Sequence, residues 1–120
     1  MQHTNGFLTL VNHAKSRIQE TDLAGYQAMA TASHTLVDVR EESEWAAGHA
    51  AGAVHLSKGI IERDIENRIP DKSAKIVLYC GGGFRSALVA DNLQKMGYTD
   101  VISLDGGWKA WAAAGMPVEK

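Results

Sequence analysis

The sequence predicts an α/β fold with a central, mainly parallel sheet of about five strands and helices on both faces. Short apolar runs rich in β-forming residues alternate along the chain with segments of helical pattern. The apolar runs lack a clean polar alternation, which is typical of strands covered on both faces of a parallel sheet. The length of 120 residues fits a single domain with one core.

The N-terminal segment predicts an amphipathic helix that Thr4 or Asn5 could cap. Its apolar residues recur at helical spacing and are Phe7, Leu10, Val11, Ala14 and Ile18. We interpret residues 1–20 as a helical extension that packs on a domain formed by residues 21–120. A helix that docks on a membrane surface or on a partner is the alternative.

The other elements follow in alternating order. The predicted strands lie at residues 35–39, 52–56, 75–80 and 100–104, with a fifth short strand near Gln19 and Glu20. The predicted helices span residues 23–30, 42–47, 60–69, 86–96 and 107–114. In the helix at 86–96, Val89, Leu93 and Met96 should face the core, and Gly97 should end the helix in a left-handed conformation.

Composition and charge exclude several classes of function. The formal net charge is -2 and the basic residues are scattered, which argues against a nucleic-acid partner. A single cysteine excludes an internal disulfide and a four-cysteine zinc site. Because the N-terminus lacks the features of a secretory signal and no apolar run approaches membrane-spanning length, we expect a cytoplasmic protein without a membrane partner.

The single cysteine, Cys80, stands in the most informative stretch of the sequence. It ends a predicted strand and precedes three glycines at positions 81–83, then Arg85 and a predicted helix. Ligand sites of open α/β sheets lie beyond the carboxyl ends of strands, and a glycine loop can turn its amide groups inward to form an anion cradle. The cradle and the helix dipole both favour a thiolate, so we expect a nucleophilic cysteine, with Arg85 able to hold an oxyanion.

Two other interpretations of Cys80 and its glycines account for fewer of these residues. Cys80 could be an inert residue buried at a strand end, but burial alone does not require three successive glycines. The glycine loop could bind a nucleotide phosphate, but the lysine and hydroxyl pair of a P-loop and the glycine spacing of a dinucleotide site are missing.

Three motifs, in order, resemble a known family. YCGGGFRSALVADNLQKMGYTDVISLDGGWKAW resembles the active-site half of single-domain rhodaneses, sulfurtransferases that carry sulfur as a cysteine persulfide. LVDVREESEWAAGHAAGAVHL and GGWKAWAAAGMPV resemble their upstream and closing signatures. The resemblance covers roughly residues 22–118 and implies a three-layer rhodanese domain at 21–120. Ala51 and Ser57 stand where the family often has proline, which concerns turn rigidity more than chemistry.

The resemblance also implies a mechanism and its partners. Cys80 would take the outer sulfur of a small donor such as thiosulfate, hold it as a persulfide, and pass it to an external acceptor such as cyanide, a small thiol or a dithiol protein. No cofactor is implied. The persulfide would be surrounded by the backbone amides of Gly81, Gly82, Gly83, Phe84, Arg85 and Ser86.

Several other residues are expected to have supporting roles. Asp38 and Arg40, at the end of a strand, should form an ion pair behind the site. His49 and His55 have no third ligand at useful spacing, so we expect no metal site and a structural role for His49. The tryptophans should fill core or rim space, and Lys58 is an exposed lysine that could assist an anionic donor. The tryptophans are Trp45, Trp108 and Trp111.

Two other function classes stay open at this point. The resemblance implies that phosphatases and arsenate reductases of the same fold have five residues between the cysteine and the arginine, whereas four, residues 81–84, intervene here. Non-catalytic rhodanese-like binding modules usually lack the cysteine or break the loop, whereas this chain keeps both Cys80 and Arg85.

Overall fold

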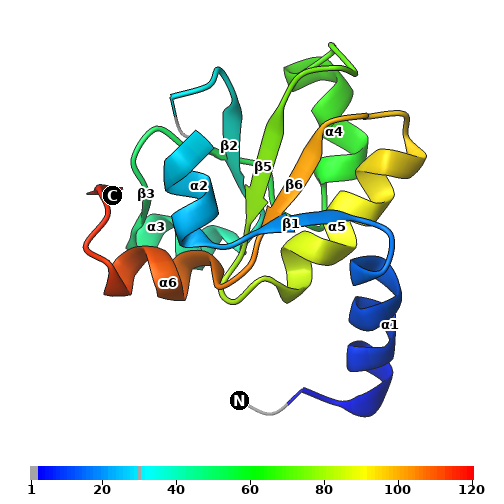
Figure 1. Cartoon of the computed structure of the whole chain (residues 1–120), viewed down its shortest axis with the longest axis horizontal. Coiled ribbons are helices and arrows are strands. Elements are labelled where there is room, and N and C mark those ends of the chain that lie inside the picture. The colour runs from blue at the N-terminus through cyan, green and yellow to red at the C-terminus, as the bar shows by residue number, and fades with distance from the viewer. Residues whose placement is uncertain (1–2, 30) are drawn as a thin grey trace.

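A five-stranded sheet forms the centre of the computed structural model, which describes residues 3–29 and 31–120 (Figure 1). The strand order is β1-β6-β5-β2-β4, and every neighbouring pair is parallel, so the parallel sheet expected from the sequence is confirmed. The short strand expected near Gln19 is β1 at one edge. The strands are β1 (Gln19–Thr21), β2 (Thr35–Asp38), β4 (Val54–His55), β5 (Ile76–Tyr79) and β6 (Val101–Leu104).

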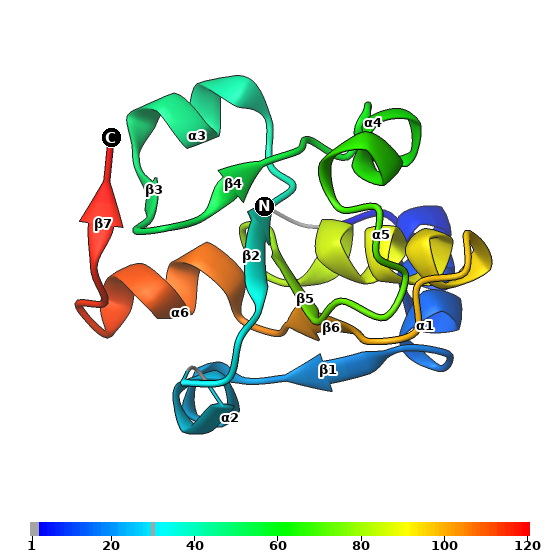
Figure 2. The ribbon, with the colours of Figure 1, turned by 90° about the horizontal axis from the view of Figure 1, so that it is seen from above.

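Helices cover both faces of this sheet, and Figure 2 shows α4 and α5 on the side opposite α2 and α6. Side chains alternate along β5: Ile76 and Leu78 pack with α4 and α5, whereas Val77 and Tyr79 pack with α2 and α6. One core cluster therefore lies between the sheet and the helices on each face, which gives three layers: helices, sheet and helices. The helices are α1 (Asn5–Lys15), α2 (Leu23–Met29), α3 (Glu42–Ala47), α4 (Ile61–Arg68), α5 (Phe84–Lys95) and α6 (Gly107–Ala113).

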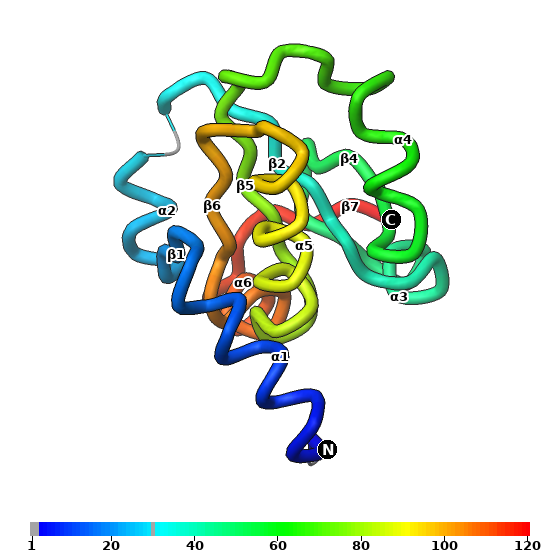
Figure 3. The backbone as a smooth tube through the Cα atoms, turned by 90° about the vertical axis from the view of Figure 1, so that its right-hand side faces the viewer, coloured from blue at the N-terminus to red at the C-terminus, as the bar shows by residue number. Residues whose placement is uncertain are grey.

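Helix α1 packs along α5 instead of on the sheet, and its N-terminal half projects beyond the rest of the chain (Figure 3). Thr4 caps it by accepting a hydrogen bond from the N–H of Phe7. Val11 and Ala14 are buried, but Leu10 is 61% exposed, so the expectation that Leu10 faces the domain is wrong. Successive helical residues are rotated by about 100°, and Leu10 falls outside the stripe that Val11 and Ala14 define.

A bidentate ion pair fixes the segment that follows α1 to α5. Arg17 donates from Nε to Oδ1 of Asp91 at 3.0 Å and from Nη2 to Oδ2 at 2.7 Å. The hydrogen bonds from the Arg17 guanidinium lower the pKa of Asp91. Gln94 of α5 also donates to the carbonyl oxygen of Arg17 at 2.9 Å. The helix is therefore anchored by both apolar and charged contacts.

Several element boundaries differ from the expected ones. The strand expected at 52–56 is reduced to two residues because Gly52 turns the chain with a φ of +82°. Helix α5 begins at Phe84 instead of Ser86, directly after Gly83. Val89 and Leu93 are buried, Met96 packs against the same cluster, and Gly97 has the expected left-handed φ of +102°. Residue 30, at the end of the helix expected at 23–30, lies outside the described residues.

A small second sheet was not expected from the sequence. Strands β3 (His49–Ala50) and β7 (Val118–Glu119) pair in antiparallel fashion and join the C-terminal segment to the end of α3. Two-residue strands are too short to produce a periodic pattern. No helix of residues 3–29 and 31–120 has both the length and the apolar character needed to cross a membrane.

Candidate active site

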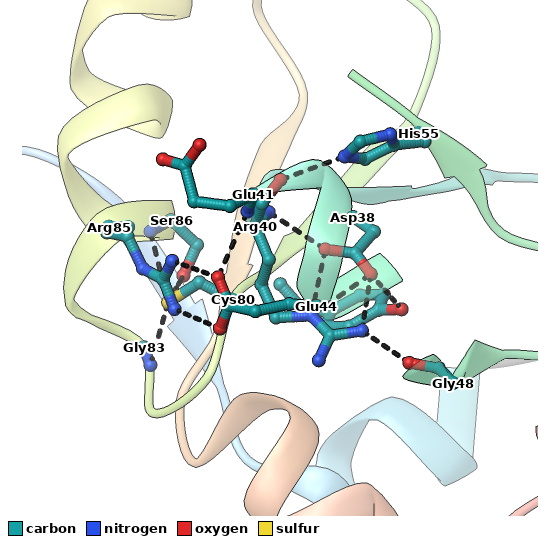
Figure 4. A network of polar contacts seen from close by, with 11 residues as sticks. Asp38, Arg40, Glu41, Glu44, Gly48, His55, Cys80, Gly83, Arg85 and Ser86 are labelled. Carbon is teal, nitrogen blue, oxygen red and sulfur yellow. Dashed lines mark hydrogen bonds and ion pairs between the residues drawn. The ribbon is translucent and has the colours of Figure 1, made fainter. Parts of the chain in front are cut away.

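Cys80 lies directly after β5, at the edge of the sheet where the carboxyl ends of β5 and β6 meet the starts of α5 and α6 (Figure 1). Its side chain is buried, and Sγ accepts hydrogen bonds from the N–H groups of Gly83 at 3.1 Å and Ser86 at 3.4 Å (Figure 4). The early start of α5 explains the second bond, because N–H groups in the first turn of a helix have no partner within it. Gly83, with a φ of +105°, makes the turn that brings both donors onto the sulfur.

Helix α6 shapes the loop between β5 and α5, residues 80–83, which we call the Cys80 loop. N–H groups at the start of α6 donate to three successive carbonyl oxygens of the loop, which turns these oxygens toward α6. The bonds run from Trp108 to Cys80 at 2.7 Å, from Lys109 to Gly81 at 3.1 Å and from Gly106 to Gly82 at 3.3 Å. The loop carbonyls are thus held away from the sulfur while N–H groups approach it.

Gly107 permits this contact between α6 and the loop. A Cβ atom at this position would lie 2.3 Å from the carbonyl oxygen of Cys80, and the residue has a left-handed φ of +45°. Only glycine combines that conformation with such a close backbone approach. The Gly-Gly-Trp segment therefore acts as a backbone clamp on the Cys80 loop.

Two buried hydroxyl groups extend the polar contacts of the cysteine. The Cys80 thiol donates to Oγ of Ser86 at 3.5 Å, and this oxygen lies 2.8 Å from Oγ of Ser103 in β6. Because hydroxyl hydrogens can rotate, the same chain can reverse and donate toward a thiolate. Sequence reasoning missed Ser103, since nothing local marks it.

Arg85 forms a bidentate ion pair with Glu44 of α3 beside the cysteine (Figure 4). Nη1 and Nη2 donate to the two carboxylate oxygens at 2.7 and 3.1 Å. The hydrogen bonds from Arg85 lower the pKa of Glu44, and those to Glu44 raise the pKa of Arg85. Glu44 was not among the expected site residues. Its capping bond with the N–H of Glu41 fixes it in α3, but its partner is 41 residues away in the sequence.

Asp38 and Arg40 form the expected ion pair, and it is almost completely buried. Arg40 donates from Nη2 to Oδ2 of Asp38 at 2.8 Å and also to the carbonyl oxygen of Gly48 at 2.7 Å. The hydroxyl of Tyr79 donates to Asp38 at 2.7 Å, and burial raises the pKa of this tyrosine. Neither charged residue lines the pocket at Cys80. The pair instead joins β2 and β5 to the end of α3, the helix that carries Glu44.

The histidines and tryptophans expected to be structural lie in packed positions. Trp45 stacks on the ring of His49 with centroids 3.4 Å apart and on that of His55 at 4.9 Å. Trp111 is buried in the α2–α6 core, and Trp108 lies 4.7 Å from the guanidinium carbon of Arg40. Within residues 3–29 and 31–120, no three His, Cys, Asp or Glu side chains form a group able to hold a metal ion.

Cys80 lines a pocket of about 1030 Å³ to which four parts of the chain contribute. The Cys80 loop and the Glu44–Arg85 pair both line it. The start of α6, including Lys109, and two residues of the N-terminal segment, His3 and Phe7, complete its lining. Lys58, considered from the sequence, does not line it. His3, Phe7 and Lys109 were not expected there, because their positions depend on how α1 and α6 pack.

Among the six residues expected to surround a persulfide, the structure separates two groups. Gly83 and Ser86 place their N–H groups on Sγ itself. The other four line the pocket into which the sulfur faces: Gly81, Gly82, Phe84 and Arg85.

Comparisons with known proteins agree with this arrangement. The chain is 36% identical over 85 residues to thiosulfate sulfurtransferase GlpE of Pseudomonas fluorescens, a match that covers 71% of this chain and 76% of that protein. It is 30% identical over 95 residues to the Coxiella burnetii protein of the same name, covering 79% and 87%. A Rhodopseudomonas palustris structure, described as a protein of unknown function and possible tyrosine phosphatase, has a TM-score of 0.82 and 29% identity. That match covers 99% of this chain and 98% of that one.

The chain also matches the model of the rhodanese-like domain over residues 22–114. These residues include β2, β4, β5 and β6, the Cys80 loop, Glu44 and the Gly-Gly-Trp clamp, but not α1. With the pocket, the sheet order and the matched residues in agreement, the chain belongs to the rhodanese-like domain family.

Proposed function

We propose that this chain is a sulfurtransferase that accepts a sulfur atom from a small donor on Cys80 and passes it to an external acceptor. The observation that carries the proposal is the setting of Cys80, a buried residue that lines the pocket and has two backbone N–H groups directed at its sulfur. The names of the Pseudomonas and Coxiella relatives support the same activity.

In the first half-reaction, the Cys80 thiolate attacks the outer sulfur of a donor such as thiosulfate. A sulfur–sulfur bond to Cys80 forms while the bond from the outer sulfur to the sulfonate sulfur breaks, and its electron pair leaves with sulfite. The N–H groups of Gly83 and Ser86 stabilise the negative sulfur, and the Ser86 hydroxyl can add a third donor. Because α5 and α6 fix the two N–H groups, these donors need no reorganisation, and the hydroxyl needs only to rotate its hydrogen.

In the second half-reaction, a nucleophile attacks the outer sulfur of the persulfide and Cys80 leaves as a thiolate. Cyanide would depart as thiocyanate, and a thiolate would depart as a persulfide. Cys80 is the single cysteine of the 120-residue sequence, so no internal thiol can receive the sulfur. The external thiol or dithiol protein acceptor and the cytoplasmic location expected from the sequence stay predictions.

Arg85 has a more limited role in this proposal than the sequence suggested. Two of its guanidinium N–H groups bind Glu44, and the remaining ones can still reach donor oxygens. Its charge, however, is offset by the Glu44 carboxylate. We therefore assign Arg85 to positioning the donor, with less attraction for a small dianion than a free arginine would give.

Hydrolysis of an aryl phosphate is the second candidate function, because the Rhodopseudomonas structure is described as a possible tyrosine phosphatase. Two observations weigh against it in this chain. Only four residues separate Cys80 from Arg85, so the N–H groups close around a single sulfur atom. Arg85, the residue that would hold a phosphate, is already paired with Glu44.

Parallel assays distinguish the two functions. The purified protein is given thiosulfate with cyanide, and separately p-nitrophenyl phosphate, and Cys80→Ser serves as the control. We expect thiocyanate formation that the serine variant lacks, with negligible phosphate release. Phosphate turnover that exceeds sulfur transfer, or sulfur transfer that survives in the serine variant, would overturn the proposal.

A further inference from the structure

We propose that helix α1 completes the substrate pocket and that the pocket selects a donor whose reactive sulfur is attached to an apolar organic group. Organic thiosulfonates and organic persulfides are donors of this class. The inference rests on the proposed sulfur transfer and names the donor for it. It concerns α1, which lies outside the residues that match the family.

An aromatic cluster, defined as His3, Phe7 and Phe84, forms the apolar wall of the pocket. The ring centroids of His3 and Phe84 are 4.6 Å apart, those of His3 and Phe7 are 5.2 Å apart, and those of Phe7 and Phe84 are 6.3 Å apart. All three residues line the same pocket as Cys80. Phe84 is the first residue of α5, whereas Phe7 lies in α1 and His3 just before it, so the N-terminal segment supplies two of the three rings.

The position of the wall is fixed by the packing of α1 on α5. Phe7, Val11 and Ala14 lie on one stripe of the helix, and the latter two are buried. The Arg17–Asp91 pair anchors the segment that follows. Phe7 is therefore held over the pocket by contacts several turns along the same helix.

Size and charge both favour an organic donor. A thiosulfate ion, a single sulfur atom on a sulfonate group, would occupy a small part of a pocket of about 1030 Å³, a volume at which sites enclose much larger ligands. Glu44 offsets the charge of Arg85, which reduces the attraction for a dianion. Lys109 lines the pocket and forms no ion pair with any residue in the described part of the chain. Lys15 lies 5.4 Å from the centroid of the Phe84 ring. It is, however, paired with Glu20 and Asp105. Lys109 is thus a cation left unpaired by the described residues, and one such charge beside an aromatic wall suits a singly charged donor with an apolar body.

The bonds that form and break are of the same kinds as with thiosulfate. The Cys80 thiolate attacks the outer sulfur of an organic thiosulfonate, and a bond between the two sulfur atoms forms. The bond from the outer sulfur to the sulfonyl sulfur breaks, and its electron pair leaves with an organic sulfinate. In this proposal the organic group packs against the aromatic cluster, and Lys109, which lines the same pocket, offers a positive charge to the sulfinate.

Two donors that differ only in the organic group test this inference. Methanethiosulfonate and benzenethiosulfonate have the same reactive sulfur and the same charge, and each is assayed with cyanide after subtraction of the uncatalysed rate. Wild type should have the higher kcat/KM for benzenethiosulfonate. Phe7→Ala should lower the ratio of the two kcat/KM values by about fivefold, the scale of one lost aromatic contact. Leu10→Ala, an exposed position on the same helix, should leave the ratio unchanged.

The outcomes separate this inference from the proposed function. Equal use of the two donors by wild type, or an unchanged ratio in Phe7→Ala, overturns the inference while sulfur transfer stands. Absence of transfer from both of them and from thiosulfate overturns both. Circular dichroism and thermal unfolding show whether Phe7→Ala keeps α1 in place. His3 precedes the helix, and His3→Ala should also lower the ratio. If Phe7→Ala does not fold, an unchanged ratio in His3→Ala overturns the inference.

Discussion

Gly107→Ala tests whether α6 shapes the Cys80 loop. The added Cβ would meet the carbonyl oxygen of Cys80 at 2.3 Å and its carbonyl carbon at 3.0 Å, both of which are backbone atoms that cannot rotate away. The left-handed φ of +45° adds about 1–2 kcal/mol for a residue with a side chain, and overpacking typically adds about 1–3 kcal/mol. The free energy of unfolding should therefore fall by about 2–5 kcal/mol.

The same change should reduce activity beyond its effect on stability. Relief of the overlap requires the loop to move away from α6, which breaks the bond from the N–H of Trp108 to Cys80 and displaces the N–H groups around Sγ. Urea unfolding gives the stability change, and thiosulfate:cyanide turnover of the folded variant gives the effect on the site. Gly59→Ala is the matched control, because a Cβ there meets nothing within 4 Å. A Gly107→Ala protein as stable and as active as this control would refute the reasoning.

Three further changes test other parts of the site. Asp38→Asn should lower the free energy of unfolding by about 3–5 kcal/mol, because it leaves the buried charge of Arg40 without its partner. Glu44→Gln should cost about 0.5–1 kcal/mol at neutral pH, the upper range for a partly exposed pair with Arg85. Because Arg85 lowers the pKa of Glu44, this difference should be fully present well above the ordinary value of 4.5. It should be lost progressively as the pH falls below 4.5 and through the lowered pKa of the folded protein. One glycine inserted after Gly83 should reduce sulfur transfer about tenfold or more, by moving the start of α5 away from the sulfur.

Each of these changes has its own control or contradicting result. Asp64→Asn removes an exposed ion pair with Arg63 and should change the urea midpoint little, so an equal effect at Asp38 would contradict the account of the buried pair. A stability difference for Glu44→Gln that does not decrease as the pH falls from about 7 to below 4.5 would contradict the assigned pairing. The inserted glycine should cost less than about 1 kcal/mol in loop closure, so undiminished sulfur transfer by the folded variant would contradict the role of the loop.

The features that can be predicted from the sequence are those that depend on residues close together in the chain. The strands, the Cys80 loop and the Asp38–Arg40 pair all arise within short segments, and the residues involved are close in the chain. The sequence predicts that α5 starts at Ser86, two residues after its actual start at Phe84. In the structure Gly83 itself supplies the turn that opens the helix.

The features that were missed depend on packing between distant segments. Glu44 reaches Arg85 across 41 residues, and Ser103 reaches Ser86 across 17. The helical stripe of α1 predicted that the helix packs on the domain, but not that Phe7 would overhang the pocket. That position follows from the contact of α1 with α5, which no local pattern specifies.

Mass spectrometry of the intact protein after exposure to thiosulfate tests the central claim most directly. We expect wild type to gain the mass of one sulfur atom, with fragmentation placing it on Cys80, and to lose it when cyanide is added. The Cys80→Ser variant should gain nothing. A folded wild-type protein that acquires no sulfur from thiosulfate or from an organic thiosulfonate, or one that carries the sulfur elsewhere, would contradict sulfur transfer through Cys80.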